Sequence, residues 1–271
     1  MEDESHISAN VERFSGFAES YDKFRPRPPA ALVEMLVQVA GESHPAVVDI
    51  GSGTGLSTLI WTGCARGVIG VEPNADMRAH AERRASDVGI SIARFVDGLS
   101  TRTGLPAGFA DIVTCSQALH WMEPEGTFAE AARILRDGGV FAAYDCDWPP
   151  TLNPQAEQAY NECLAHAAEI ERTRHLSREV RKWSKEGHLE RMRRSGRFGY
   201  VSEAVFHHVE EGDAERLVGI ALSQGGIETL LKHGLSEDEI GITELRSTLR
   251  RVLGTKAVPW FWSYRVRIGV K

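Results

Sequence analysis

The first half of the chain alternates short apolar runs with segments of helical periodicity. The apolar runs have the length and composition typical of strands that are buried on both faces. They predict five strands, at residues 46–51, 67–74, 90–98, 109–119 and 140–146. Apolar residues at helical spacing predict four helices, at residues 30–40, 57–65, 75–89 and 124–139. Strand–helix alternation of this kind predicts right-handed crossovers and a parallel sheet.

After residue 150 the pattern becomes mainly helical. It predicts helices at 154–171, 179–196, 213–234 and 236–254, and two further strands at 198–211 and 259–270. The sequence therefore predicts an α/β fold, a doubly wound, mostly parallel seven-stranded Rossmann-like sheet with a helical cap inserted after the fifth strand. The helical block is either this cap or a separate small domain, although no flexible linker is visible.

Composition and charge narrow the class of protein. The 271 residues include 42% hydrophobic and 25% charged side chains, as in soluble globular proteins, and the net charge of -7 argues against a general nucleic-acid binder. The basic run at 172–185 is predicted to be the solvated face of a helix. No apolar run is long enough to span a membrane. The four cysteines lack metal-ligand spacing, which favours reduced thiols and a cytoplasmic protein.

Three glycines, Gly51, Gly53 and Gly55, follow the first predicted strand in the stretch VDIGSGTG. In an open parallel sheet, ligands bind beyond the carboxyl ends of the strands, and glycine lets the backbone approach them closely. A dinucleotide-binding turn would need its third glycine at position 56, where this chain has Leu56. The spacing therefore counts against a nicotinamide-dependent enzyme.

This stretch resembles the first motif of the class I S-adenosylmethionine-dependent methyltransferases. The resemblance implies that Gly51, Ser52, Gly53 and Gly55 approach the cofactor. It also implies that Asp49 holds the positively charged amino end of the cofactor, directly or through water. Glu72, at the end of the second strand, is then expected to accept hydrogen bonds from the ribose hydroxyls, a role that a nicotinamide enzyme also gives to such an acid.

The resemblance extends to the ends of the third and fourth strands. Asp97 is implied to bond the adenine amino group and the Gly98 backbone to meet a ring nitrogen. Met77 either lies against adenine or packs in the core of its helix. The methionine portion of the cofactor is expected near Ser116 and Gln117.

The stretch ALHWM places His120 and Trp121 beside the sulfonium, facing the substrate. His120 is either a general base or a group that positions the acceptor, because a carboxylate acceptor needs no base whereas a hydroxyl, an amine or an acidic carbon does. Asp145 and Asp147 are predicted to be caps or turn formers. His207 and His208 point to opposite faces of a strand, so no metal site is expected.

The leading stretch SGFAESYDKFRPRPP resembles small-molecule methyltransferases related to trans-aconitate and juvenile-hormone-acid methyltransferases. It implies a lid in which Tyr21 and Arg25 close over the cofactor. The predicted organisation is a lid and first helix at 1–40, a cofactor-binding core at 41–148, and a cap with the last strands of the same sheet at 149–271.

The implied activity is methyl transfer from S-adenosylmethionine to a small molecule, at a carboxylate or hydroxyl oxygen. The enzyme is expected to be a monomer or a homodimer without nucleic-acid or membrane partners. A nicotinamide-dependent oxidoreductase and a non-catalytic regulator that binds S-adenosylmethionine are the alternatives.

Overall fold

A computed structural model describes residues 4–16, 22–176 and 180–271 of the chain. The chain divides into two compact units. The first, here called the helical unit, contains residues up to Pro26, Asp147–Val180 and His207–Ser263. The second, called the sheet unit, contains Arg27–Cys146, Arg181–Phe206 and Tyr264–Lys271. The contacts thus group the N-terminal segment with the helices that follow the fifth strand, and they divide the predicted 1–40 segment after Pro26.

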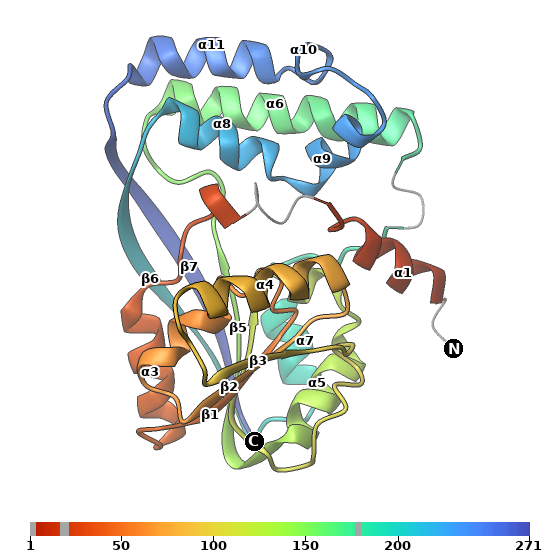
Figure 1. Cartoon of the computed structure of the whole chain (residues 1–271), viewed down its shortest axis with the longest axis vertical. Helices are drawn as coiled ribbons and strands as arrows, with labels where there is room; N and C mark the ends of the chain where they lie inside the picture. The colour runs from red at the N-terminus through yellow and green to blue at the C-terminus, as the bar shows by residue number, and fades with distance from the viewer. Residues whose placement is uncertain (1–3, 17–21, 177–179) are drawn as a thin grey trace. The chain divides into compact units, whose positions relative to one another are not determined.

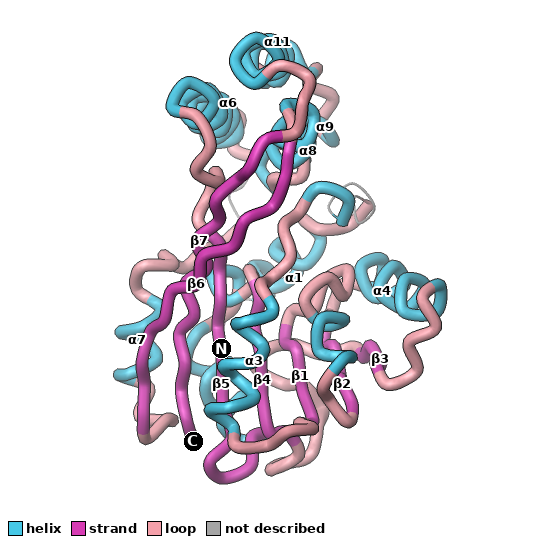
Figure 2. Tube along the Cα trace, turned by 90° about the vertical axis from the view of Figure 1, so that its left-hand side faces the viewer, coloured by secondary structure: helices cyan, strands magenta, loops and turns pink. Residues whose placement is uncertain are grey.

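The strands form one seven-stranded sheet in the order β3-β2-β1-β4-β5-β7-β6 (Figure 2). Their bounds are β1 Ala46–Ile50, β2 Gly67–Val71, β3 Ala93–Val96, β4 Ala110–Ser116, β5 Leu135–Cys146, β6 Tyr200–Gly212 and β7 Val258–Val270. Strands β1 to β5 pair in parallel, and β7 runs antiparallel to β5. The predicted mostly parallel, seven-stranded α/β sheet is confirmed.

Helices cover both faces of this sheet (Figure 1). Those of the sheet unit are α3 Ala30–Ala40, η1 Thr58–Gly63, α4 Ala75–Asp87, η2 Leu119–Trp121, α5 Pro124–Ile134 and α7 His188–Arg194, where η marks a 3-10 helix. On one face, Leu32 and Leu36 of α3 and Trp61 of η1 pack on the sheet. On the other face, Phe128 of α5 and Met192 of α7 do so. The alternating side chains of the central strands are therefore buried on both sides, as their apolar composition predicts.

The helical unit is built mainly from a packed group of helices. They are α1 Glu4–Glu12, α6 Pro154–Thr173, α8 Ala214–Leu222, α9 Gly225–Lys232, α10 Glu237–Ile240 and α11 Ile242–Leu253. Helix α11 packs on α6 and α8, and α6 packs on α9 (Figure 1). No helix in the described part of the chain is long and apolar enough to cross a membrane.

Several predicted helices are shorter than their periodicity suggested. The segment 57–65 is a 3-10 helix rather than an α-helix, and the helix at 124–139 ends at Ile134, where β5 begins. Helix 236–254 is divided at Gly241, whose left-handed backbone (φ 91°) ends α10. Helix 213–234 is likewise divided, into α8 and α9. Local periodicity does not register such breaks, because the apolar spacing continues through them.

The largest difference concerns the predicted helix at 179–196. Only His188–Arg194 is helical, and residues 180–187 have no helical structure. Here the Trp183 N–H donates to the His120 carbonyl oxygen at 2.9 Å. A distant part of the chain thus supplies the partner that a helix would have supplied locally, and the predicted solvated helix face is wrong for this part of the basic run.

Candidate active site

The parallel register brings the carboxyl ends of the first strands to one edge of the sheet. Ile50 lies opposite Val71, and Val71 lies opposite Val96. Asp49 of β1 lies opposite Thr114 of β4. The residues that follow β1, β2, β3 and β4, which the sequence singled out separately, are therefore neighbours at this edge.

The glycines of the turn after β1 serve two different purposes. Gly51, Gly53 and Gly55 all have positive φ, of 71°, 54° and 78°. A Cβ at Gly51 would lie 2.8 Å from the Ala118 Cβ, and one at Gly55 would lie 2.9 Å from the Phe95 ring, so packing excludes side chains there. A Cβ at Gly53 would meet no atom within 4 Å. Gly53 is thus the glycine whose surroundings leave room for a ligand.

Glu72 ties this turn to the end of β2. Its Oε2 accepts a hydrogen bond from the Gly53 N–H, and its Oε1 accepts one from the Asn74 N–H, both at 2.9 Å. Burial raises the pKa of this carboxyl, and these two bonds oppose the rise. Each carboxylate oxygen has a second lone pair, so both can accept a further hydrogen bond from a ligand hydroxyl.

Asp49 lies inside the sheet unit and is fully buried. Its two oxygens accept hydrogen bonds from the Thr58 and Thr114 hydroxyls, both at 2.7 Å. Burial raises the pKa of Asp49 from 3.8 to about 6. The carboxylate braces β1 against η1 and β4, an arrangement that does not present it directly to a ligand. Its predicted hold on the amino end of a cofactor remains a prediction.

The residues expected around adenine differ in their surroundings. Met77 is 3% exposed and faces the interior from α4, as its core interpretation expects. The Asp97 side chain is 76% exposed and pairs with Arg78 at 3.0 Å. A Cβ at Gly98 would lie 2.8 Å from Val71 Cγ1, so close packing requires this glycine. Of these residues, Asp97 is the one that presents its polar atoms outward.

Gln117 follows Ser116, the last residue of β4, with an unusual backbone. Its φ is 52°, a conformation that non-glycine residues adopt rarely and often at functional sites. The Gln117 N–H donates to the Tyr144 carbonyl at 2.9 Å, and the side-chain amide donates to Cys146 Sγ at 2.8 Å. Ser116 lies opposite Tyr144 in the sheet. The strand end is thereby fixed against β5.

His120 and Trp121 lie next to each other in η2, with ring centroids 5.1 Å apart. The His120 side chain is 14% exposed, and its Nδ1 lies 3.8 Å from Asp145 Oδ1. Lys182 lies 4.5 Å from the centroid of the Trp121 ring. The sequence predicted that His120 and Trp121 lie together at this edge, but it gave no sign of the lysine or of the contact between His120 and Asp145.

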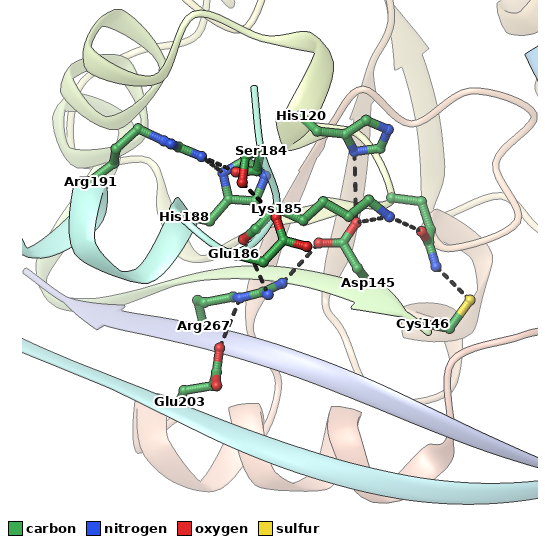
Figure 3. Close-up of polar contacts among 11 residues, drawn as sticks. His120, Asp145, Cys146, Ser184, Lys185, Glu186, His188, Arg191, Glu203 and Arg267 are labelled. Atoms are coloured by element: carbon green, nitrogen blue, oxygen red, sulfur yellow. Dashed lines mark hydrogen bonds and ion pairs between the residues drawn. The ribbon is translucent and has the colours of Figure 1, made fainter. Parts of the chain in front are cut away.

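Asp145 is the centre of an ion cluster at the end of β5 (Figure 3). Its Oδ2 lies 2.9 Å from Arg267 Nη1, and its Oδ1 lies 3.0 Å from Lys185 Nζ. Arg267 also pairs with Glu203 at 3.0 Å, and Lys185 also donates to Gln117 Oε1 at 3.2 Å. Asp145 is thus a buried strand residue, and its prediction as a cap or turn former is wrong.

The predicted lid residues are Tyr21 and Arg25. Tyr21 falls outside the described residues. Arg25 belongs to the helical unit, where it donates to the Ser223 hydroxyl and carbonyl oxygens at 3.0 and 2.7 Å. Its guanidinium also lies 4.8 Å from the Trp148 ring centroid. Their cofactor roles remain predictions.

No group of three His, Cys, Asp or Glu side chains within the described ranges is arranged to hold a metal ion. His207 hydrogen-bonds to Ser263 Oγ at 3.2 Å, and His208 lies 3.5 Å from Glu210. The two histidines therefore have separate partners in the helical unit.

Comparisons with known proteins match the part of the chain that contains this site to a family. Residues 48–143 match the family described as "Methyltransferase domain". The chain is 30% identical over 129 residues to a Dictyostelium discoideum protein named as a methyltransferase, covering 47% of this chain and 46% of that protein. It is 30% identical over 164 residues to trans-aconitate 2-methyltransferase of Acidovorax sp., covering 55% and 59%. Residues 48–143 are therefore similar to a methyltransferase domain, and the relatives that the chain matches are named as methyltransferases.

The fold of the chain agrees with that of a solved structure. A protein from Anaeromyxobacter dehalogenans described as a type II methyltransferase superposes with a TM-score of 0.64 at 23% identity, covering 91% of this chain and 98% of that one. In sequence, the chain spans about half the length of the curated relatives it matches. The domain match favours the methyltransferase over a nicotinamide-dependent oxidoreductase.

The residues at the strand ends of the methyltransferase domain fit its cofactor, S-adenosylmethionine. Gly53 leaves open space at the turn, and the Glu72 oxygens retain acceptor capacity for ribose hydroxyls. Asp97 offers an exposed carboxylate at the next strand end. Arg267 and Lys185 were missed by sequence reasoning. The only signal for Lys185 was its place in the basic run, and Arg267 is one of two arginines in the last strand, which the sequence does not tell apart.

Proposed function

We propose that this methyltransferase transfers the methyl group of S-adenosylmethionine to a carboxylate oxygen of a small acidic acceptor. The observation that supports the proposal is the position of cations beside the residues after β4. Lys182 lies over Trp121, and Lys185 bonds to Gln117. In a chain with a net charge of -7, such a local group of cations favours a small anion over a polyanion such as nucleic acid.

A relative supports the same acceptor class. The Acidovorax protein, of which the chain covers 59%, is named for trans-aconitate, an acid. A carboxylate is ionised at neutral pH, so it attacks the methyl group without a base. The cofactor supplies an activated methyl group, and the protein has to hold the two reactants in line. In this scheme His120 positions the acceptor.

A hydroxyl acceptor is the second candidate, and one observation favours it. The 3.8 Å approach of His120 Nδ1 to Asp145 suits a histidine whose other ring nitrogen acts as a base. Asp145 would then hold the imidazole in the required orientation, as carboxylates do in other histidine-dependent sites.

Methyl transfer from labelled S-adenosylmethionine to a panel of carboxylic acids, their methyl esters and phenols tests the proposal. We expect acids to be labelled and their esters to remain unlabelled. Labelling of phenols alone would refute the carboxylate acceptor in favour of a hydroxyl. If the chain binds S-adenosylhomocysteine but labels no member of the panel, a non-catalytic role is favoured.

The variant His120→Gln separates the two roles of the histidine. With a carboxylate acceptor we expect a loss of only a few-fold in kcat or a change in KM, with no effect on the pH dependence near neutrality. With a hydroxyl acceptor, kcat should fall by about 10²–10⁴, and the rate should no longer rise with pH through the ordinary imidazole pKa of about 6.5. Cofactor affinity should match that of the parent in both cases.

A further inference from the structure

The segment 181–187, which includes the end of the basic run, runs beside the residues that follow β4. The Trp183 N–H donates to the His120 carbonyl, and Lys182 lies over the Trp121 ring. Lys185 reaches furthest into this region, since its Nζ lies within bonding distance of both Gln117 and Asp145. Gln117 at the strand end, His120 and Trp121 therefore all contact this one cationic segment.

The two oxygens of Asp145 have separate partners. Oδ2 pairs with Arg267, whose side chain is 4% exposed and which is also bonded to Glu203. Oδ1 faces Lys185 at 3.0 Å and His120 Nδ1 at 3.8 Å (Figure 3). Arg267 is thus held between two carboxylates inside the protein. Lys185 and His120 share one oxygen, so their nitrogens lie close to each other.

Lys185 differs from Arg267 in its access to a ligand. Its side chain is 30% exposed. An ammonium group has three N–H donors, and Lys185 donates one to Gln117 while it forms an ion pair with Asp145. If Lys185 turns toward a new anion, Asp145 keeps its bond to Arg267, so no buried carboxylate loses its only cation.

We infer that Lys185 binds the carboxylate of the methyl acceptor and that Asp145 is the positioning residue that presents it. The inference rests on the proposed function, because it assumes an acidic acceptor. Another N–H of Lys185 donates to the carboxylate of the acceptor, while the Gln117 amide oxygen and the negative charge of Asp145 hold the ammonium beside His120. Lys185 then selects acids over neutral esters of the same shape.

The test compares Lys185→Met and Asp145→Asn with the control Lys256→Met, which removes an exposed lysine from the loop before β7. The probes are trans-aconitate, succinate and their methyl esters, measured by calorimetry with S-adenosylhomocysteine present and by methyl transfer. For the acid that the parent binds best, Lys185→Met should raise KM or Kd by about 10- to 100-fold, the effect of a lost charge-assisted hydrogen bond. We expect kcat to change by only a few-fold and the affinity for S-adenosylhomocysteine to match that of the parent.

Asp145→Asn should raise KM in the same direction but by less, because the ammonium remains and only its orientation is lost. Lys256→Met should behave as the parent. A second measurement needs no Lys185→Met variant. The NMR signal of the ¹³C-labelled Lys185 side chain is assigned by its loss in Lys185→Arg. This signal should shift when the acid is added and should not shift with its ester. If the parent binds none of the acids, the proposed function itself fails. If the acid binds Lys185→Met as tightly as the parent, the assignment of Lys185 is wrong and the proposed function stands.

Discussion

At the scale of single residues, Glu72 combines a structural role with a proposed ligand role. Its oxygens accept hydrogen bonds from the N–H groups of Gly53 and Asn74, and each keeps a lone pair that can accept from a ribose hydroxyl. We predict that Glu72→Ala weakens the binding of S-adenosylhomocysteine by roughly 1.5–3 kcal/mol, because it removes hydrogen bonds to a charged acceptor. Isothermal titration measures the change, with Asp76→Ala in the first turn of α4 as the control. A folded Glu72→Ala protein with parental affinity would exclude Glu72 from the ribose site.

Asp49 gives a second prediction at this scale, through its dependence on pH. Since burial raises its pKa from 3.8 to about 6, the folded state binds the proton more tightly than the unfolded state between these values. Stability therefore falls as the pH rises from about 4 to about 6, by about 3 kcal/mol. Asp49→Asn has no carboxyl to titrate and should lack this fall. As the pH rises from about 4 to about 6, the variant should therefore gain stability relative to the parent. Urea denaturation at four pH values measures it, and parallel pH curves for the two proteins would contradict the assignment.

At the scale of elements, the turn after β1 contains one glycine that packing requires, Gly55, and one that leaves room for a ligand, Gly53. Both Gly53 and Gly55 have positive φ, so an alanine at either position costs about 1–2 kcal/mol. Gly55→Ala should cost clearly more, because its Cβ would also lie 2.9 Å from the Phe95 ring.

Gly53→Val should fold and yet lose affinity for S-adenosylhomocysteine, since its side chain would occupy open space at the strand end. Urea denaturation and calorimetry measure the two effects. Parental affinity in a folded Gly53→Val variant would refute the ligand role of Gly53.

At the scale of the whole molecule, the N-terminal segment belongs to the helical unit, and a buried ion pair fixes it there. Arg13 lies 2.7 Å from Glu171 near the end of α6, with side chains 2% and 12% exposed. Arg13→Ala should lower the unfolding free energy by about 3–5 kcal/mol, because it leaves a buried carboxylate without this cation. Arg172→Ala breaks an exposed pair with Glu169, which water screens, so its effect on the unfolding free energy should be far smaller. Thermal denaturation of both variants tests the difference, and equal losses would show that the Arg13 pair is no stronger than a surface pair.

The sequence by itself determined the order of the strands, the glycine turn and the residue types at the ends of β1 to β4. These features are local: strand composition, glycine spacing and an acid at a strand end are encoded within a few residues of one another. The parallel register then follows from strand–helix alternation, which is why Glu72, Asp97 and His120 could be predicted as neighbours of the turn.

Only the tertiary structure decided what surrounds His120 and Asp49. Lys185 and Arg267 reach Asp145 from distant parts of the chain, and no local pattern records such a meeting. Within the helix that periodicity predicted at 179–196, residues 180–187 are not helical, and the His120 carbonyl accepts the hydrogen bond of the Trp183 N–H. Asp49 is likewise buried, and its carboxylate oxygens bond to two threonines and are not exposed at the surface. Burial and long-range hydrogen bonds depend on the assembled fold. The sequence could therefore predict which edge of the sheet carries the candidate site, but not that Lys185 and Arg267 lie there.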